Sequence, residues 1–156
     1  MNALRRSYLM PVYTGPEFPH PPCKWWRAPE GSYRKQRRLS PTDTVVIHAT
    51  AGSSSSGAMS VTQQRTASWH ALIPDEDEEA HGQYIWRCVD DSAAAWHVLS
   101  SKQHPVDKRT NINDRSLGIE IVNAQTDADK FSLWQVEVTA DLVSHWCSVH
   151  PIQYIY

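Results

Sequence analysis

Short stretches of apolar, often β-branched residues recur along the chain, and each is bounded by polar or small residues. Residues 44–48 (TVVIH) end in His48 and lead into a run of small residues, which is typical of a buried strand that enters a surface loop. Residues 68–74 (SWHALIP) predict a second strand, and residues 83–90 (QYIWRCVD) alternate like its antiparallel partner. The acidic segment between them, residues 75–82, predicts an exposed turn.

A further alternating segment, residues 116–123 (SLGIEIVN), carries one acidic side chain inside an apolar pattern. Its alternation puts Leu117, Ile119 and Ile121 on one face of the predicted strand and Glu120 on the other. Burying a carboxylate without a partner is costly. The pattern therefore indicates either an ion-paired or edge-exposed Glu120, or a carboxylate kept there for its chemistry.

Helical spacing replaces alternation near the end of the chain. In residues 132–149, Val138, Leu142, Trp146 and Val149 recur every three or four positions, which predicts an amphipathic helix packed against a sheet.

A second, shorter helix is predicted over residues 56–67, with Ser56 or Ser60 as its N-cap. After Pro151 the chain predicts one more strand. Strands and helices in this order indicate an α/β fold in which a sheet is flanked by helices.

The length of 156 residues suggests one domain. Residues 1–43 are rich in Pro, aromatic and basic residues and lack either period, so we expect an extended arm pinned by Trp25 and Trp26, with the domain over residues 44–156. Residues 1–40 hold eight Lys/Arg against two Asp/Glu, whereas the remainder holds seven against fifteen. Such an arm can contact an anionic polymer or rest on its own acidic domain. No nucleic-acid-binding motif accompanies it, so no nucleic-acid partner is expected.

Compartment signals are few. No apolar run approaches the roughly 20 residues that cross a bilayer, and the first residues contain no apolar core followed by a small-residue cleavage site. We therefore expect synthesis in the cytoplasm without a recognisable signal peptide, and no membrane span. Cys23, Cys88 and Cys147 are widely spaced and predict free thiols rather than a disulfide framework. The sequence indicates no particular oligomeric state.

Three segments in this order resemble the zinc-dependent N-acetylmuramoyl-L-alanine amidase family: TVVIHATAG, then ASWHALI with AAAWH, then NDRSLGIEIVN. That family includes wall-recycling amidases, phage lysins (endolysins) and peptidoglycan-recognition proteins. The resemblance covers about residues 44–156 and implies their mixed-sheet fold. It also implies hydrolysis of the amide between the lactyl group of N-acetylmuramic acid and L-alanine, with peptidoglycan or a muropeptide as partner. The alternative from another class is a metal-free peptidoglycan-binding or structural module with the same fold.

The resemblance implies roles for the two residues already singled out. His48 matches the family's first zinc ligand, and Glu120 matches the acidic residue that recycling-type amidases place over the zinc as a general base. The chemistry agrees, because a catalytic zinc takes three protein ligands and a water whose pKa it lowers toward about 7. From the residues alone, a hydrogen-bonded histidine at a strand end remains the other interpretation of His48.

Four further residues match positions that the resemblance implies for the substrate cleft or its support. His70 and His97 stand in the S-x-H and A-W-H segments and are assigned to support or substrate binding rather than to the metal. Trp96 lines the predicted sugar-peptide groove beside His97, or packs against it. Asn123 is expected to hydrogen-bond peptide-stem amides, as Asn111 and Asn113 in the preceding loop also could, although turn formation explains all three equally well.

The resemblance also predicts a deficit. In family members the helix that matches residues 132–149 is followed by a strand and then by a segment with the second and third zinc ligands and a cation that steadies the oxyanion. The sequence stops at Tyr156, within the expected strand. We therefore expect full Zn²⁺ coordination to need ligands not present in this chain, and the domain over residues 44–156 to lack its C-terminal zinc-ligand segment. On its own, the chain is expected to hydrolyse little.

Overall fold

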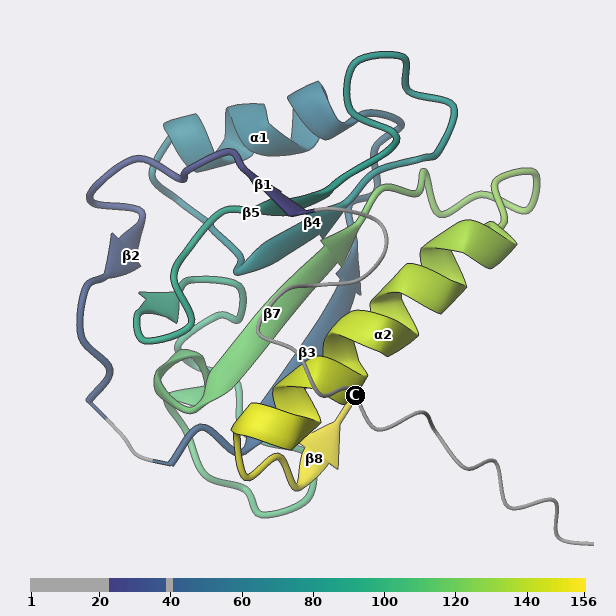
Figure 1. Cartoon of the computed structure of the whole chain (residues 1–156). Coiled ribbons are helices and arrows are strands. Elements are labelled where there is room, and N and C mark those ends of the chain that lie inside the picture. The colour runs from purple at the N-terminus through teal and green to yellow at the C-terminus, as the bar shows by residue number, and fades with distance from the viewer. Residues whose placement is uncertain (1–22, 39–40) are drawn as a thin grey trace, which may run out of the picture.

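The structure is a computed structural model that describes residues 23–38 and 41–156. Its centre is a six-stranded mixed sheet with the strand order β1-β5-β4-β7-β3-β8, beside a two-stranded sheet of β2 and β6 (Figure 1). The strands are β1 (Cys23–Trp25), β2 (Tyr33–Arg34), β3 (Thr44–Ala49), β4 (Ala71–Ile73), β5 (Ile85–Arg87), β6 (Ala94–Ala95), β7 (Ser116–Ile121) and β8 (Tyr154–Ile155). The helices are α1 (Ser55–Gln63) and α2 (Leu133–Val149), with a 3-10 turn at Ile112–Asp114.

Strand β7 lies in the middle of the larger sheet and pairs in parallel with β3 on one side and β4 on the other. Strands β4 and β5 are antiparallel, as the sequence predicts for the segments around the acidic turn. The last strand, β8, pairs in parallel with the first part of β3. The predicted α/β class with a mixed central sheet is therefore confirmed.

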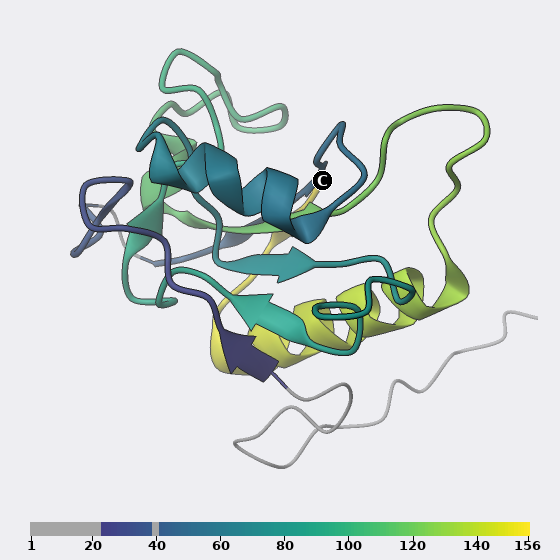
Figure 2. The same cartoon turned by 90° about the horizontal axis from the view of Figure 1, so that it is seen from above.

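Helix α2 covers one face of the sheet and lies opposite α1 (Figure 2). Its predicted stripe of Val138, Leu142 and Trp146 is buried against Leu117, Ile119 and Ile121, the alternating face of β7. The helix begins after Ser132, whose side chain accepts from the Gln135 backbone N–H in a reciprocal capping box. The expectation for Val149 is wrong, because this last helical residue is 56% exposed beyond the packed turns.

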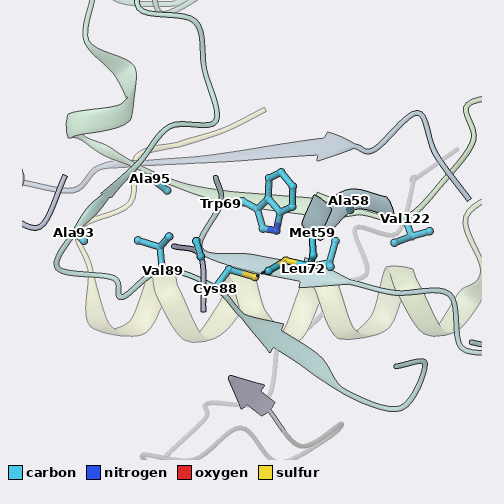
Figure 3. Packing of buried hydrophobic residues seen from close by; sticks show 10 residues of the cluster. Ala58, Met59, Trp69, Leu72, Cys88, Val89, Ala93, Ala95 and Val122 are labelled. Atoms are coloured by element: carbon cyan, nitrogen blue, oxygen red, sulfur yellow. Dashed lines mark hydrogen bonds between the residues drawn. The ribbon is translucent and has the colours of Figure 1, made fainter. Parts of the chain in front are cut away.

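Helix α1 covers the other face with a second apolar cluster that includes Met59, Trp69, Leu72 and Cys88 (Figure 3). Its N-cap is Ser54, whose side chain accepts from the Gly57 N–H at 3.1 Å.

The predicted caps Ser56 and Ser60 are therefore wrong: the helix has already begun at Ser55. Both carboxylate oxygens of Glu78 accept from the Ser55 backbone N–H, at 2.9 and 3.0 Å. The acidic turn is thus only partly exposed, because Glu78 is bound to the start of α1.

The described part of the predicted arm belongs to the fold itself. Strand β1 pairs in parallel with β5, and β2 pairs with β6. Trp26 packs on Trp86 with ring centroids 5.4 Å apart, whereas Trp25 is 47% exposed. The arm predicted over residues 1–43 is thus continuous with the domain from Cys23 on, and residues 1–22 lie outside the described residues.

Arg37 anchors this segment to the sheet. Its guanidinium donates to three backbone carbonyls, those of Asp91 (2.9 and 3.0 Å), Asn113 (3.2 Å) and Ser116 (2.8 Å). Burial lowers the Arg37 pKa to about 10. A guanidinium has no acceptor groups and suits a cluster of carbonyl oxygens.

None of the helices in the described residues combines the length and apolar character that crossing a bilayer needs. The three cysteines form no disulfide with one another, as predicted.

Candidate active site

His48 and Glu120 are direct neighbours in the sheet. They are paired in register on the parallel strands β3 and β7, so their side chains leave the same face of the sheet. Adjacent strands are about 4.8 Å apart, and this sets the spacing of the two residues. Both lie near the carboxyl ends of β3 and β7, two parallel strands that run side by side in Figure 1. The structure thus brings the two principal predicted residues together.

Glu120 is a half-buried carboxylate in an apolar setting. Its neighbour on the other side, in β4, is the fully buried Leu72. Within residues 23–38 and 41–156 Glu120 makes neither an ion pair nor a hydrogen bond, so nothing compensates its charge. Burial raises the pKa of Glu120 to about 7. A carboxyl group with such a pKa can both take up and release a proton near neutral pH, as a general acid–base group must.

The His48 imidazole is half-buried and points toward a second histidine. Its Nε2 lies 3.3 Å from Nδ1 of His97, and the two rings meet edge to face with centroids 5.5 Å apart. Burial lowers the pKa of His48, which favours the neutral ring.

His97 is held from three sides. Its ring lies on Gly118, where a Cβ atom would come within 2.5 Å of the ring. Its Nε2 is 3.0 Å from the Ser116 hydroxyl, and its backbone N–H donates to Oδ1 of Asn113 at 3.2 Å. Burial, and then the neighbouring His48, lower the pKa of His97 to about 3. The ring is therefore neutral at any ordinary pH.

His70 is fully buried below the site. Its Nδ1 accepts from the Gly118 backbone N–H at 2.9 Å, and its Nε2 lies 3.2 Å from the Ala93 carbonyl oxygen. Burial, and then nearby Arg37, lower the pKa of His70 well below its usual value. His70 exposes no surface to a substrate, and its hydrogen bonds fit the support role that the sequence left open.

Trp96 and His97 line a pocket of about 450 Å³. Its wall also contains Asn113 and an ion pair between Arg34 and Asp114. Trp96 is half-buried, so one part of the indole packs and the other faces the pocket. This pocket is a candidate place for part of a substrate next to the histidines.

Asn123 is buried and bound to its own loop. Its Nδ2 donates to the Asp129 carbonyl oxygen at 3.1 Å, and its Oδ1 accepts from the Gln125 backbone N–H at 2.8 Å. The side chain therefore has its hydrogen bonds in the turn, which was the alternative explanation from the sequence.

The described residues do not assemble a complete metal centre. In the stretches 23–38 and 41–156, no three His, Cys, Asp or Glu side chains are placed to hold one ion. A catalytic zinc needs three protein ligands. His48 suits one of them, since it is a half-buried, neutral imidazole beside an uncompensated carboxylate, but the set around it does not fit zinc without further ligands.

Reasoning from the sequence missed Ser116, Gly118 and Arg37. Gly118 carried a usable signal, because a glycine inside a strand often marks a close approach by another group. The other two had none: a serine at a strand start and an arginine in a basic segment look like many surface residues.

The comparisons with known proteins identify the family and the fold. The family model of the N-acetylmuramoyl-L-alanine amidases matches residues 38–156. The chain belongs to this family. No curated protein gives a significant match to the sequence of this amidase-family member.

Solved structures share the amidase fold. The amidase AmiD from E. coli, in complex with the substrate anhydro-N-acetylmuramic acid-L-Ala-D-γ-Glu-L-Lys, has a TM-score of 0.60 at 25% identity, covering 74% of this chain and 47% of AmiD. A second structure is AmpDh3 from Pseudomonas aeruginosa in complex with anhydromuramic pentapeptide. Its TM-score is 0.59 at 27% identity, and the match covers 79% of this chain and 52% of AmpDh3. An AmpD structure has a TM-score of 0.60 at 18% identity, and the match covers 85% of this chain and 79% of AmpD. It shows the shared fold. The chain spans about half the length of AmiD and AmpDh3.

Proposed function

We propose that this amidase-family chain is part of an N-acetylmuramoyl-L-alanine amidase that hydrolyses the amide between the lactyl group of N-acetylmuramic acid and L-alanine in peptidoglycan. The observation that carries the proposal is the in-register pair of His48 and Glu120 on one face of the sheet. The substrate class is supported by AmiD, whose structure contains anhydro-N-acetylmuramic acid-L-Ala-D-γ-Glu-L-Lys, and by AmpDh3, whose structure contains anhydromuramic pentapeptide.

In the proposed reaction Glu120 handles the proton. A water oxygen attacks the amide carbonyl carbon, and the ionised Glu120 takes a proton from that water. The C–N bond then breaks, and Glu120 passes the proton to the departing amine of L-alanine. A pKa of about 7 suits both halves of this transfer.

We propose that the reaction depends on zinc, with His48 as one ligand and the other ligands outside the described residues. Bound zinc supplies Lewis-acid polarisation of the carbonyl and of water. His70 and Asn123 support the site in this proposal, and Trp96 and His97 line the cleft. We further propose that the protein meets its substrate in cell-wall material.

A second function, binding peptidoglycan without hydrolysis, has one observation in its favour. The described residues place no three potential ligands around a metal ion, while the pocket beside Trp96 and His97 remains available to bind a muropeptide.

Zinc content and muropeptide release separate the two functions. Both are measured for this chain, for a longer product of the same reading frame if one exists, and for Glu120→Gln and Glu79→Gln variants of the more active form. An amidase binds near one zinc per chain and releases peptide, loses about a hundredfold or more in rate with Glu120→Gln, and is unaffected by the exposed Glu79→Gln. Tight muropeptide binding with no release and no zinc in any form identifies the binding module instead.

A further inference from the structure

A continuous series of short contacts leads from the site into the protein. His48 Nε2 lies 3.3 Å from His97 Nδ1, and His97 Nε2 lies 3.0 Å from the Ser116 hydroxyl oxygen. That hydroxyl lies 2.8 Å from the backbone carbonyl oxygen of Ile112. Ser116 is fully buried, so water does not substitute for any partner at this end of the series.

The chemistry of the last member fixes the direction of every bond. A backbone carbonyl only accepts, so the Ser116 hydroxyl proton points at Ile112. Without that proton two oxygen atoms would face each other at 2.8 Å. The Ser116 oxygen can then only accept, and His97 Nε2 must carry the proton between them.

The same reasoning assigns the ring proton of His48. A neutral imidazole has one N–H, so Nδ1 of His97 is an unprotonated acceptor. The proton between the two histidines therefore belongs to Nε2 of His48. Nδ1 of His48 is then unprotonated, and within the described residues it has no hydrogen-bond partner.

We propose that Ser116 and His97 are positioning residues that lock His48 in its Nε2–H tautomer, so that Nδ1 presents a free lone pair beside Glu120. The inference rests on the proposed function for its purpose, because a free imidazole lone pair is what a metal ligand or a proton acceptor needs. Histidine ligands commonly donate their other N–H to a fixed acceptor, which sets the tautomer and the ring orientation.

The packing explains how the lock is held. The ring of His97 fits on the bare backbone of Gly118, and Asn113 accepts from the backbone N–H groups of both His97 and Val98. Its Nδ2 also donates to the Val98 carbonyl oxygen at 2.7 Å. The position of the ring is therefore set by backbone contacts that do not depend on a ligand.

The ring tautomers are directly measurable. Long-range ¹H–¹⁵N correlation spectra of the ¹⁵N-labelled chain at neutral pH distinguish Nδ1–H from Nε2–H, and His48→Asn and His97→Asn assign the two rings. We expect both rings as Nε2–H. An Nδ1–H tautomer of His48 in the wild type, or a doubly protonated His97, would overturn the proposal.

The variants test the role of Ser116. Ser116→Ala should weaken the Nε2–H preference of both rings by about fivefold, the worth of one hydrogen bond. Ser116→Thr keeps a hydroxyl and should restore it, and the exposed Ser60→Ala should change nothing. Backbone amide spectra check folding, and the wild-type tautomers decide the matter if Ser116→Ala does not fold. Unchanged tautomers in a folded Ser116→Ala chain contradict the lock.

Hydrolysis plays no part in this readout, so a chain with the expected tautomers and no amidase activity refutes only the proposed function.

Discussion

At the scale of single residues, the site depends on side chains that do no chemistry themselves. Glu120 has its raised pKa because Leu72 and the packed sheet exclude water from it. His97 lies where it does because residue 118 has no side chain. The proposed catalytic pair and the residues that support it therefore form one packed unit, in which the missing side chain at residue 118 makes room for the His97 ring.

Gly118→Ala should disturb this unit strongly. The new Cβ would meet three atoms of the His97 ring at 2.5 to 2.8 Å, and the ring is held in place by Ser116 and Asn113. We expect the free energy of unfolding to fall by about 1–3 kcal/mol, as for other overpacked cores.

Urea unfolding measures this loss against Gly52→Ala, whose Cβ would find its nearest atoms 3.9 Å away. Equal stabilities of the two variants would mean that the ring of His97 yields easily.

At the scale of elements, the contacts at the start of α1 show how loops complete the fold. Ser54 is the N-cap of the helix. The backbone N–H of the next residue, Ser55, donates to the carboxylate of Glu78 in the loop between β4 and β5. A carboxylate at a helix N-terminus is stabilised by the free N–H groups and by the helix dipole. The acidic loop thereby helps to hold α1 on the sheet.

Glu78→Gln should therefore destabilise the protein, while Glu79→Gln should not. Glu78 accepts from the Ser55 N–H and from the Ser55 hydroxyl at 2.9 Å, whereas the neighbouring Glu79 is exposed. We expect a loss of about 1 kcal/mol for Glu78→Gln, with salt reducing the difference. Thermal unfolding at low and high salt is the measurement, and losses of similar size in both variants would contradict the contact.

Much of this element level was predictable, because hydrophobic periodicity is local. The alternation around Glu120 predicted β7 and its buried face, and the spacing of Val138, Leu142 and Trp146 predicted α2. The N-cap of α1 was misplaced because several serines in a row make equally good caps by sequence. Periodicity gave no sign of β1, because an edge strand of three residues is too short to show a period.

The contacts that complete the site could not be predicted for a different reason. The side chains of His97 and Ser116 form a hydrogen bond although they are 19 residues apart in the sequence. Arg37 donates to the Ser116 carbonyl oxygen from 79 residues away. Neither pair leaves a local pattern. The family resemblance pointed to the histidine segments but not to how their protons are arranged.

At the scale of the whole molecule, burial of neutral histidines links stability to pH. In the unfolded chain His70 is protonated near the ordinary histidine pKa of about 6.5, whereas in the folded chain burial depresses the His70 pKa and the ring stays neutral. As pH falls below about 6.5, His70 binds a proton in the unfolded state but not in the folded state. The free energy of unfolding therefore falls by up to about 1.4 kcal/mol for each pH unit because of His70.

Glu120 and Asp75 act in the opposite direction. Their pKa values are raised to about 7 and about 6, so both bind protons more readily when folded and oppose the loss as pH falls. The contribution of His70 is therefore measured as the difference in the free energy of unfolding between the wild type and His70→Asn. The asparagine keeps an acceptor for the Gly118 N–H but does not titrate. We expect chemical denaturation between pH 7 and 5 to give a flatter profile for the variant. Parallel profiles would show that His70 has no part in the pH dependence.

The anchoring of Arg37 bears on how the protein can be divided. The family match begins one residue after it, and the strand that contains His48 begins at residue 44. A fragment cut at either point loses β1, β2 and the guanidinium that ties three carbonyls together, although it retains every residue assigned to chemistry. For recombinant work, we therefore expect a fragment that keeps these contacts to start at or before Cys23, upstream of the border that sequence similarity alone suggests.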